Sequence, residues 1–231
     1  MTITWLEKKE LIAIVPKKLK GANVVLDIGC GILPQSLVRA QVHICCDPFG
    51  EYVALLQRTL VSEWDRTYII LQASWADVVE LFPPKSVDTV FLMDVIEHVE
   101  KDEALRLLRI TETLARKQVA VYTPLGFLPQ SHPDGTDAWG LHGGAWQEHK
   151  SGWEPKDFGE SWDIYAARVY HTHDNLGKEF STPYGALWAI RTFDSPEVER
   201  KGPGWRKRKA HIVLDAAADR IARIRGVFRW E

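Results

Sequence analysis

The sequence predicts a doubly wound α/β fold, in which helices cover both faces of a mostly parallel sheet. Strand-like and helix-like segments alternate from residue 24 to residue 124, and the strand-like segments are apolar at nearly every position. Strands that are apolar on both faces are typical of parallel sheets buried between two layers of helices. Two further strand-like segments after residue 160 predict an antiparallel pair at the sheet edge.

The expected elements follow one another at short intervals. A leading helix is expected over residues 3–19, interrupted or kinked at Pro16, and it precedes the first strand at 24–28. The later strands are expected at 42–46, 68–71, 87–93, 119–123, 162–173 and 184–193. Helices with one apolar face are expected at 33–40, 51–60, 75–82, 101–116 and in the tail from Ile212 onward.

The composition limits the classes of protein to which the chain can belong. The chain has 231 residues, of which 45% are hydrophobic and 26% charged, as is ordinary for a globular protein with a sizeable core. A formal net charge of -2 creates no overall field that would favour nucleic acid or a membrane surface. An odd number of cysteines, 3, argues against a disulfide framework and favours a reducing compartment. Since no signal peptide or membrane-spanning run is recognisable, we expect a cytoplasmic protein.

The expected organisation is one domain over residues 1–195 and an appendage over 196–231, made of a basic linker and a C-terminal helix packed on the core. Residues 125–157, called the long loop below, carry Gly, Pro, His, Trp and Asp without a sustained period. A loop of this length inside a compact domain usually has a function, and we interpret it as a lid over a substrate site. Recurring tryptophans could line an acceptor pocket or pin this loop to the core: Trp139, Trp146, Trp153 and Trp162.

A small-molecule site is predicted at the carboxyl ends of the strands, next to the first strand, where ligands bind in open parallel sheets. The first strand ends on Asp27 and turns through two glycines in residues 29–31, a combination that brings bare backbone against a ligand. Asp47 follows the second strand about 20 residues later, the interval expected for an acid that holds a ribose diol. A dinucleotide fingerprint needs a third glycine where this chain has Pro34, which disfavours a pyrophosphate site.

The motifs together resemble those of the class I S-adenosylmethionine-dependent methyltransferases, particularly the methyltransferase type 11 group related to ubiquinone biosynthesis. They are the Asp-x-Gly-x-Gly loop at 27–31, the acid Asp47, the fourth-strand segment 87–99 and the fifth-strand segment 121–124. The resemblance covers about residues 20 to 125. It implies a seven-stranded sheet of the Rossmann-like methyltransferase type with an antiparallel last strand, and S-adenosyl-L-methionine as the methyl donor.

The resemblance also implies which residues bind the cofactor. They are Asp27, Gly29, Cys30, Gly31, Asp47, Pro48, Gln72, Ala73, Ser74, Met93, Asp94 and Val95. Asp47 is expected to hold the ribose hydroxyls, and residues 93–95 the methionine amine through backbone oxygens. Two positions depart from the family's pattern. Leu33 replaces a frequent third glycine, and Gln72 replaces a frequent Asp, although an amide can still hydrogen-bond an adenine edge.

Two histidines are the candidate catalytic residues. Methyl transfer is an in-line displacement at a reactive sulfonium carbon, so the protein needs mainly to place the acceptor and to exclude water. A hydroxyl or amine acceptor also needs a base, and His98 after the fourth strand and His149 in the long loop are the candidates. The structural alternatives are a helix-starting residue for His98 and a lid-stabilising residue for His149.

The sequence therefore predicts an enzyme that methylates an oxygen or nitrogen of a small-molecule or glycan-type acceptor. No metal site is expected, because His171, His173 and Asp174 have a suitable spacing but no further ligand. Two alternatives stay open: a module that binds S-adenosylmethionine or a nucleotide without catalysis, and a nucleic-acid methyltransferase that uses the basic segment 206–209. The second is disfavoured because no basic stripe with interleaved aromatic residues accompanies that segment.

Overall fold

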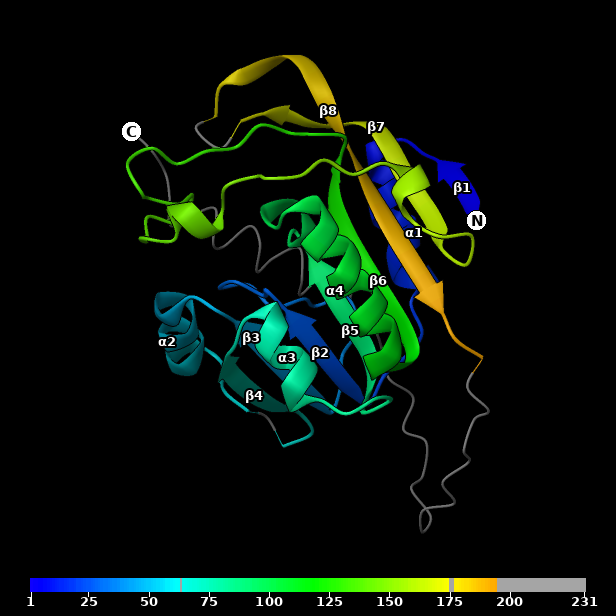
Figure 1. The fold of residues 1–231 in the computed structure, drawn as a ribbon, viewed down its shortest axis with the longest axis vertical. Helices are drawn as coiled ribbons and strands as arrows, with labels where there is room; N and C mark the ends of the chain where they lie inside the picture. The colour runs from blue at the N-terminus through cyan, green and yellow to red at the C-terminus, as the bar shows by residue number, and fades with distance from the viewer. Residues whose placement is uncertain (63, 175–176, 195–231) are drawn as a thin grey trace. The chain divides into compact units, whose positions relative to one another are not determined.

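The computed structural model describes residues 1–62, 64–174 and 177–194 (Figure 1). Its strands are β1 (Thr2–Trp5), β2 (Val24–Ile28), β3 (Val42–Asp47), β4 (Thr67–Gln72), β5 (Val87–Met93), β6 (Ala115–Leu125), β7 (Asp163–His173) and β8 (Glu179–Thr192). Its α-helices are α1 (Lys8–Lys18), α2 (Gly50–Thr59), α3 (Trp75–Leu81) and α4 (Lys101–Leu114). Short 3-10 helices are η1 (Ile96–His98), η2 (Gly144–Trp146) and η3 (Pro155–Asp157).

In the described residues the strands form one eight-stranded sheet in the order β1-β7-β8-β6-β5-β2-β3-β4. Strand β8 runs antiparallel to β6 and β7, and the remaining neighbours pair in parallel. The winding reverses beside β2, because β3 and β4 lie on one side of it and β5 and β6 on the other. The predicted mostly parallel α/β sheet with an antiparallel last strand is confirmed.

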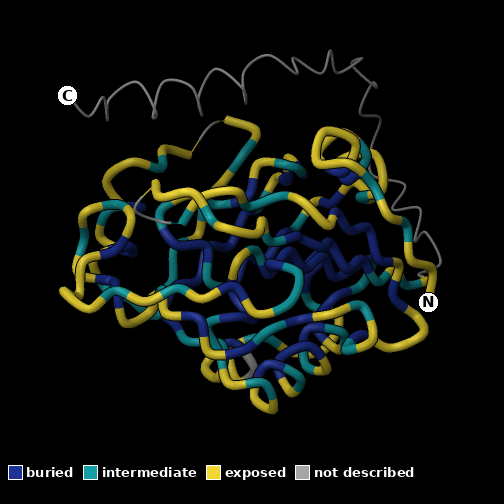
Figure 2. Tube along the Cα trace, turned by 90° about the horizontal axis from the view of Figure 1, so that it is seen from above, coloured by how far each residue is buried: buried dark blue, intermediate teal, exposed yellow. Residues whose placement is uncertain are grey.

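Both faces of the sheet are buried under helices because its central strands are mostly apolar on both faces. Successive residues of a strand point to opposite faces, so Leu26 packs in one core cluster and Val25 in the other. The cluster around Leu26 contains residues of α3 and α4, and the cluster around Val25 contains Leu11 and Val15 of α1. Figure 2 shows the buried residues concentrated in the interior of the described chain.

The N-terminal segment differs from the expected single helix over residues 3–19. Residues 2–5 form β1, which pairs in parallel with β7 and adds an eighth strand, so the expected count of seven is wrong. The β-branched residues Thr2, Ile3 and Thr4 favour an extended chain, and a capping box between Glu7 and Glu10 starts α1 only at Lys8. As a result, the predicted pair β7 and β8 does not form the sheet edge on that side.

The helix expected at residues 33–40 is absent from the structure. Asp27 Oδ2 accepts a hydrogen bond from the Gln35 backbone N–H, at 2.7 Å. The buried Gln35 side chain bonds both the N–H and the carbonyl of Val38, each at 3.0 Å. These side-chain bonds replace those of a helical turn. The basic linker and the C-terminal helix expected in 196–231 lie outside the described residues.

The long loop is fixed to the core at its second half. Backbone bridges join Trp153 to Leu125 and Gly126, and the Trp153 side chain is fully buried. Trp162 is also buried, whereas Trp146 is 50% exposed. Two of the four tryptophans thus pin the chain to the core instead of lining a pocket. None of the helices in the described part of the chain has the length and apolar character needed to cross a membrane.

Candidate functional site

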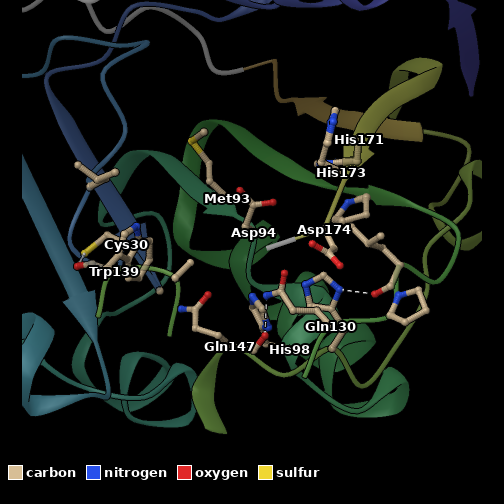
Figure 3. Close-up of a pocket in the computed structure, with 18 of the residues that line it drawn as sticks. Cys30, Met93, Asp94, His98, Gln130, Trp139, Gln147, His171, His173 and Asp174 are labelled. Atoms are coloured by element: carbon tan, nitrogen blue, oxygen red, sulfur yellow. Dashed lines mark hydrogen bonds between the residues drawn. The ribbon is translucent and has the colours of Figure 1, made fainter. Parts of the chain in front are cut away.

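A cavity of about 420 Å³ lies at the carboxyl ends of β2, β5 and β6 (Figure 3). One wall is the turn after β2, residues 29–31, and a second wall comes from residues 93, 94 and 98 after β5. The long loop supplies Gln130, Trp139, Gln147 and His149, and the β7–β8 hairpin supplies His171 and His173. The long loop therefore forms one side of the predicted small-molecule site.

The turn after β2 requires its glycines. Gly29 has a φ of +66° and Gly31 a φ of +55°, in the left-handed region that favours glycine. A Cβ on Gly29 would lie 2.8 Å from Cγ2 of Val95, and a Cβ on Gly31 would lie 3.1 Å from Cη2 of Trp139. The N–H groups of Gly29 and Cys30 donate to the Cys46 carbonyl, at 2.8 and 3.2 Å. The turn is thereby held against β3 with its bare backbone facing the cavity.

Asp27 is buried behind this turn and does not line the cavity. Besides the Gln35 N–H, its Oδ2 atom faces Nε2 of His43 at 3.1 Å. The Arg66 guanidinium lies 2.7 Å from Nδ1 of the same ring. Because guanidinium groups only donate, Nδ1 faces Arg66 as an acceptor, and His43 donates its Nε2–H to Asp27. Asp27 thus positions the segment that follows the glycine turn.

Asp47 lies next to the glycine turn, and its carboxylate accepts hydrogen bonds from backbone N–H groups. Its Oδ2 accepts from the Gly31 N–H and its Oδ1 from the Phe49 N–H, both at 2.9 Å. Burial raises the pKa of the Asp47 carboxyl, although these two bonds oppose the rise. Asp47 also pairs with Gln72 across β3 and β4. The residues expected to bind the adenosine half cluster at these strand ends, outside the cavity lining.

Asp94 lines the cavity in a backbone conformation unusual for a residue with a side chain, with a φ of +52°. Its N–H donates to the Tyr122 carbonyl at 3.0 Å, which ties the end of β5 to β6. Protein packed around its carboxyl, which stays open to solvent on the cavity side, raises its pKa to about 6, and the adjacent Glu97 opposes part of that rise. Glu97 is therefore its direct neighbour.

Glu97, on η1, is a buried acid that the sequence analysis did not single out. Its Oε2 accepts from Thr123 Oγ1 at 3.0 Å, and its Oε1 has no hydrogen-bond partner among the described residues. Burial and the nearby charge of Asp94 raise the pKa of the Glu97 carboxyl well above its usual range. Its position directly before His98 was the available signal, because both follow a strand that ends at the predicted site.

The two candidate catalytic histidines meet in the structure, with ring centroids 4.8 Å apart. Nδ1 of His98 donates to the Glu148 carbonyl at 3.1 Å, and Nδ1 of His149 donates to the Leu128 carbonyl at 2.5 Å. Each Nε2 is therefore the unprotonated nitrogen of a neutral ring. Burial lowers the pKa of His98 to about 4, with a further contribution from His149, and burial also lowers the pKa of His149.

Comparisons with known proteins support the fold. No protein-family model and no curated protein matches the sequence. A solved SAM-dependent methyltransferase of Methanosarcina mazei superposes with a TM-score of 0.54 at 15% identity, over 77% of this chain and 96% of that chain. The chain has the class I methyltransferase fold. TehB of Haemophilus influenzae superposes with a TM-score of 0.53 at 11% identity, over 79% of this chain and 62% of that chain.

Within this methyltransferase fold, the structure separates the predicted site residues into two groups. The cavity is lined by Gly29, Cys30, Gly31, Met93, Asp94, His98 and His149. It is not lined by Asp27, Asp47, Pro48, Gln72, Ala73, Ser74 or Val95. Of this second group, Gln72 Nε2 donates to the Pro48 carbonyl at 3.3 Å, and the Ala73 N–H donates to the Asp47 carbonyl at 3.0 Å. Ser74 caps α3.

The turn at residues 137–143 fastens the long loop to α2 of the methyltransferase fold. Asp137 is buried, and its carboxylate accepts from the N–H groups of Trp139, Leu141 and Gly143. The Tyr52 hydroxyl donates to the same carboxylate at 2.5 Å, and the Tyr52 and Trp139 rings meet edge to face. Trp139 is thereby held over Gly31.

Replacing Tyr52 by phenylalanine is expected to lower the free energy of unfolding by about 1 kcal/mol, because Asp137 loses its buried hydroxyl donor. We also expect limited proteolysis to cut the long loop faster. The matched control is Tyr184→Phe, whose ring packs on Phe180 of the β7–β8 hairpin. Equal cleavage rates for Tyr52→Phe and the wild type would show that this bond does not hold the loop.

His171 gives the protein a measurable acid sensitivity. Its Nε2 is buried without a partner in the described residues. Burial, with the charges of Lys8 and His149, lowers its pKa from 6.5 to about 4. As the pH falls, His171 is therefore protonated in the unfolded chain before it is protonated in the folded protein. The stability contributed by neutral His171 is fully present above the unfolded-state pKa of 6.5, and it is lost as the pH falls from 6.5 to about 4.

Chemical denaturation near pH 8 and near pH 5 measures this effect. We expect His171→Gln to retain about 1 kcal/mol more stability at the lower pH, relative to the wild type, after allowance for the partial exposure of the ring. His173→Gln, on the same strand and exposed, serves as the control. The same acid loss in His171→Gln as in the wild type would assign the sensitivity to other groups.

Proposed function

We propose that the protein transfers a methyl group from S-adenosyl-L-methionine to an oxygen or nitrogen of a small-molecule or glycan-type acceptor. One observation carries the proposal. The cavity is lined by the bare glycine backbone after β2, by the Asp94 carboxylate and the neutral ring of His98 after β5, and by the neutral ring of His149 from the long loop. A charged sulfonium donor and a neutral acceptor need these two kinds of environment side by side.

The cavity fits the methionine half of the cofactor. The backbone of residues 29–31 can approach a ligand closely because Gly29 and Gly31 carry no Cβ, and Val95 and Trp139 leave little room for one. The carboxylate of Asp94 can pair with the cofactor's ammonium group, since it is ionised above a pKa of about 6. The adenosine half is assigned to Asp47, Pro48, Gln72, Ala73 and Ser74, at the neighbouring strand ends. When bound, the cofactor supplies a methyl group on a positively charged sulfur.

His98 and His149 are proposed to contact the acceptor. Each ring presents an unprotonated Nε2, which can accept a hydrogen bond from an acceptor O–H or N–H group. A pKa of about 4 makes His98 a weak base, so its main contribution is to orient the acceptor. The long loop covers this end of the cavity and excludes water from the reacting groups.

Calorimetry with S-adenosylhomocysteine, in a buffer containing EDTA, tests the cofactor assignment. Asp94→Asn keeps a residue that tolerates the left-handed backbone and removes the charge that faces the ammonium group. We expect it to weaken binding about tenfold or more, the effect of one charge-assisted hydrogen bond. Glu100→Gln, exposed at the start of α4, is the control and should bind as the wild type does. No heat from the wild type, or equal affinity in Asp94→Asn, contradicts the assignment.

A further inference from the structure

We propose that Glu97, His98 and His149 bind a divalent transition-metal cation at the acceptor end of the cavity. One ligand atom from each residue lies within 4.8 Å of the other two. His98 and His149 both line the cavity, and Figure 3 shows His98 beside Gln130 and Gln147. The three residues come from two segments of the chain, η1 and the long loop, that are far apart in the sequence.

Both imidazole rings are oriented as metal ligands usually are. Metal-binding histidines typically donate one ring N–H to a carbonyl or carboxylate, which fixes the tautomer and leaves the other nitrogen for the metal. Nδ1 of His98 and Nδ1 of His149 donate to the carbonyls of Glu148 and Leu128 in this way. Their Nε2 atoms are therefore free to donate electron pairs to a cation without losing a proton.

Glu97 supplies an independent indication. Its side chain is 2% exposed, and Oε1 has no hydrogen-bond partner within the described residues. Leaving such a buried acceptor unsatisfied costs about 1 to 3 kcal/mol, more if it is charged. The Asp94 carboxyl beside it adds to the negative charge. A cation between Oε1 and the two rings would satisfy that oxygen and neutralise the buried acids.

The backbone holds the ligands together. The carbonyl of Glu97 accepts from the N–H groups of Lys150 and Ser151, at 2.7 and 3.1 Å. The single O–H of Ser151 lies within hydrogen-bond distance of the Ile96 and Val99 carbonyls, with Oγ at 3.0 and 2.8 Å from them. These bonds tie the residues directly after His149 to η1, which carries Glu97 and His98. The three ligands are thus positioned by a built contact between two segments and not by chance proximity of mobile side chains.

The donor set selects the kind of cation. Two imidazole nitrogens and one carboxylate suit Zn²⁺, Fe²⁺ or Co²⁺, whereas Mg²⁺ and Ca²⁺ prefer oxygen ligands. Bonds of about 2.0 to 2.2 Å require the ligand atoms to approach one another by up to roughly 1.5 Å, within the reach of side-chain rotation. Three protein ligands leave further coordination positions, as in catalytic sites. Because the two histidines line the cavity, these positions face it.

This site deepens the proposed function, and its consequence for the acceptor rests on that function. A hydroxyl bound to a divalent cation loses its proton at a lower pH than a free hydroxyl. The weakly basic His98 would then act as a ligand, and the acceptor would be an oxygen compound. Metal binding itself needs no cofactor, so it can be measured separately.

The test uses the full chain after removal of metals with EDTA and exchange into chelator-free buffer. Calorimetry with Zn²⁺ and Co²⁺ is expected to show one cation bound per chain, and Mg²⁺ to bind far more weakly. Co²⁺ absorption bands then report nitrogen ligation. His149→Ala and Glu97→Gln should each weaken Co²⁺ binding by about tenfold or more. His173→Ala, which lines the cavity outside the cluster, should not change it.

Each outcome decides the inference. No Co²⁺ or Zn²⁺ binding by the wild type overturns it, as does equal binding in Glu97→Gln and the wild type. A loss in His173→Ala as large as in His149→Ala assigns the cation elsewhere and also overturns it. Thermal melting in EDTA checks that the variants fold. If the protein binds S-adenosylhomocysteine but not Co²⁺, the metal site is refuted and the methyltransferase proposal stands. If it binds Co²⁺ but not S-adenosylhomocysteine, the methyltransferase proposal is refuted and the metal site stands.

Discussion

Replacing Trp153 by alanine is expected to lower the free energy of unfolding by about 3 to 5 kcal/mol. The side chain is fully buried, and it packs on Phe158 with ring centroids 5.7 Å apart. The Lys101 ammonium lies 3.6 Å from the Trp153 ring centroid, and the indole N–H donates to Ser151 Oγ at 3.1 Å. Removing the ring leaves a cavity and several groups without their partner, so both the core and the long loop are weakened.

Urea denaturation of Trp153→Ala beside Trp146→Ala measures this contribution. Trp146 belongs to the same loop but is 50% exposed, so its loss should cost below about 1 kcal/mol. Trp153→Phe should recover part of the loss, since a ring still fills the space under α4. Similar destabilisation by the two alanine variants would show that Trp153 does not anchor the loop.

Gly29→Ala is expected to destabilise the glycine turn and to weaken S-adenosylhomocysteine binding by about tenfold or more. A left-handed backbone costs a residue with a Cβ about 1 to 2 kcal/mol. The new Cβ would also lie 2.8 Å from Cγ2 of Val95 and 3.2 Å from Cγ1. The turn would therefore shift toward the space where we place the cofactor's methionine half.

A double variant separates these two causes. Val95→Ala removes both methyl groups that the new Cβ meets. Combining it with Gly29→Ala should therefore restore the stability and affinity lost to that contact, but not the stability and affinity lost to the left-handed backbone. Gly21→Ala is the control, because a Cβ there meets nothing within 4 Å. Additive effects of the two substitutions, on binding and on the free energy of unfolding, would refute the contact with Val95.

The elements best predicted from the sequence are those whose pattern is local. The strands Val24–Ile28 and Val87–Met93 have the expected bounds, because a short, mostly apolar run between polar turns admits few other structures. The strand Thr2–Trp5 was missed because its partner begins at Asp163, and such a distant pairing leaves no local pattern. The prediction of a helix at 33–40 was wrong, because Gln35 makes hydrogen bonds with Asp27 and Val38 in place of those of a helical turn.

The candidate site was predictable in part for the same reason. The glycine turn and the segment after β5 carry local motifs, and both line the cavity. The contact between His98 and His149 depends on how the long loop packs, which its irregular composition does not encode. Glu97 became informative only when the structure showed it buried beside both rings with an unpartnered oxygen. A sequence motif does not reveal which of its side chains lack a hydrogen-bond partner.

The position of Trp139 has a kinetic consequence. This ring lies over Gly31 on the cofactor side, yet it belongs to the same loop that carries His149 on the acceptor side. Opening the turn fastened by Asp137 therefore uncovers the Gly31 side of the cavity, while His149 stays in place because the residues after it are bonded to Glu97. If the proposed methyltransferase function holds, we expect release of the spent cofactor to be the slow step, with turnover limited by how often that turn opens.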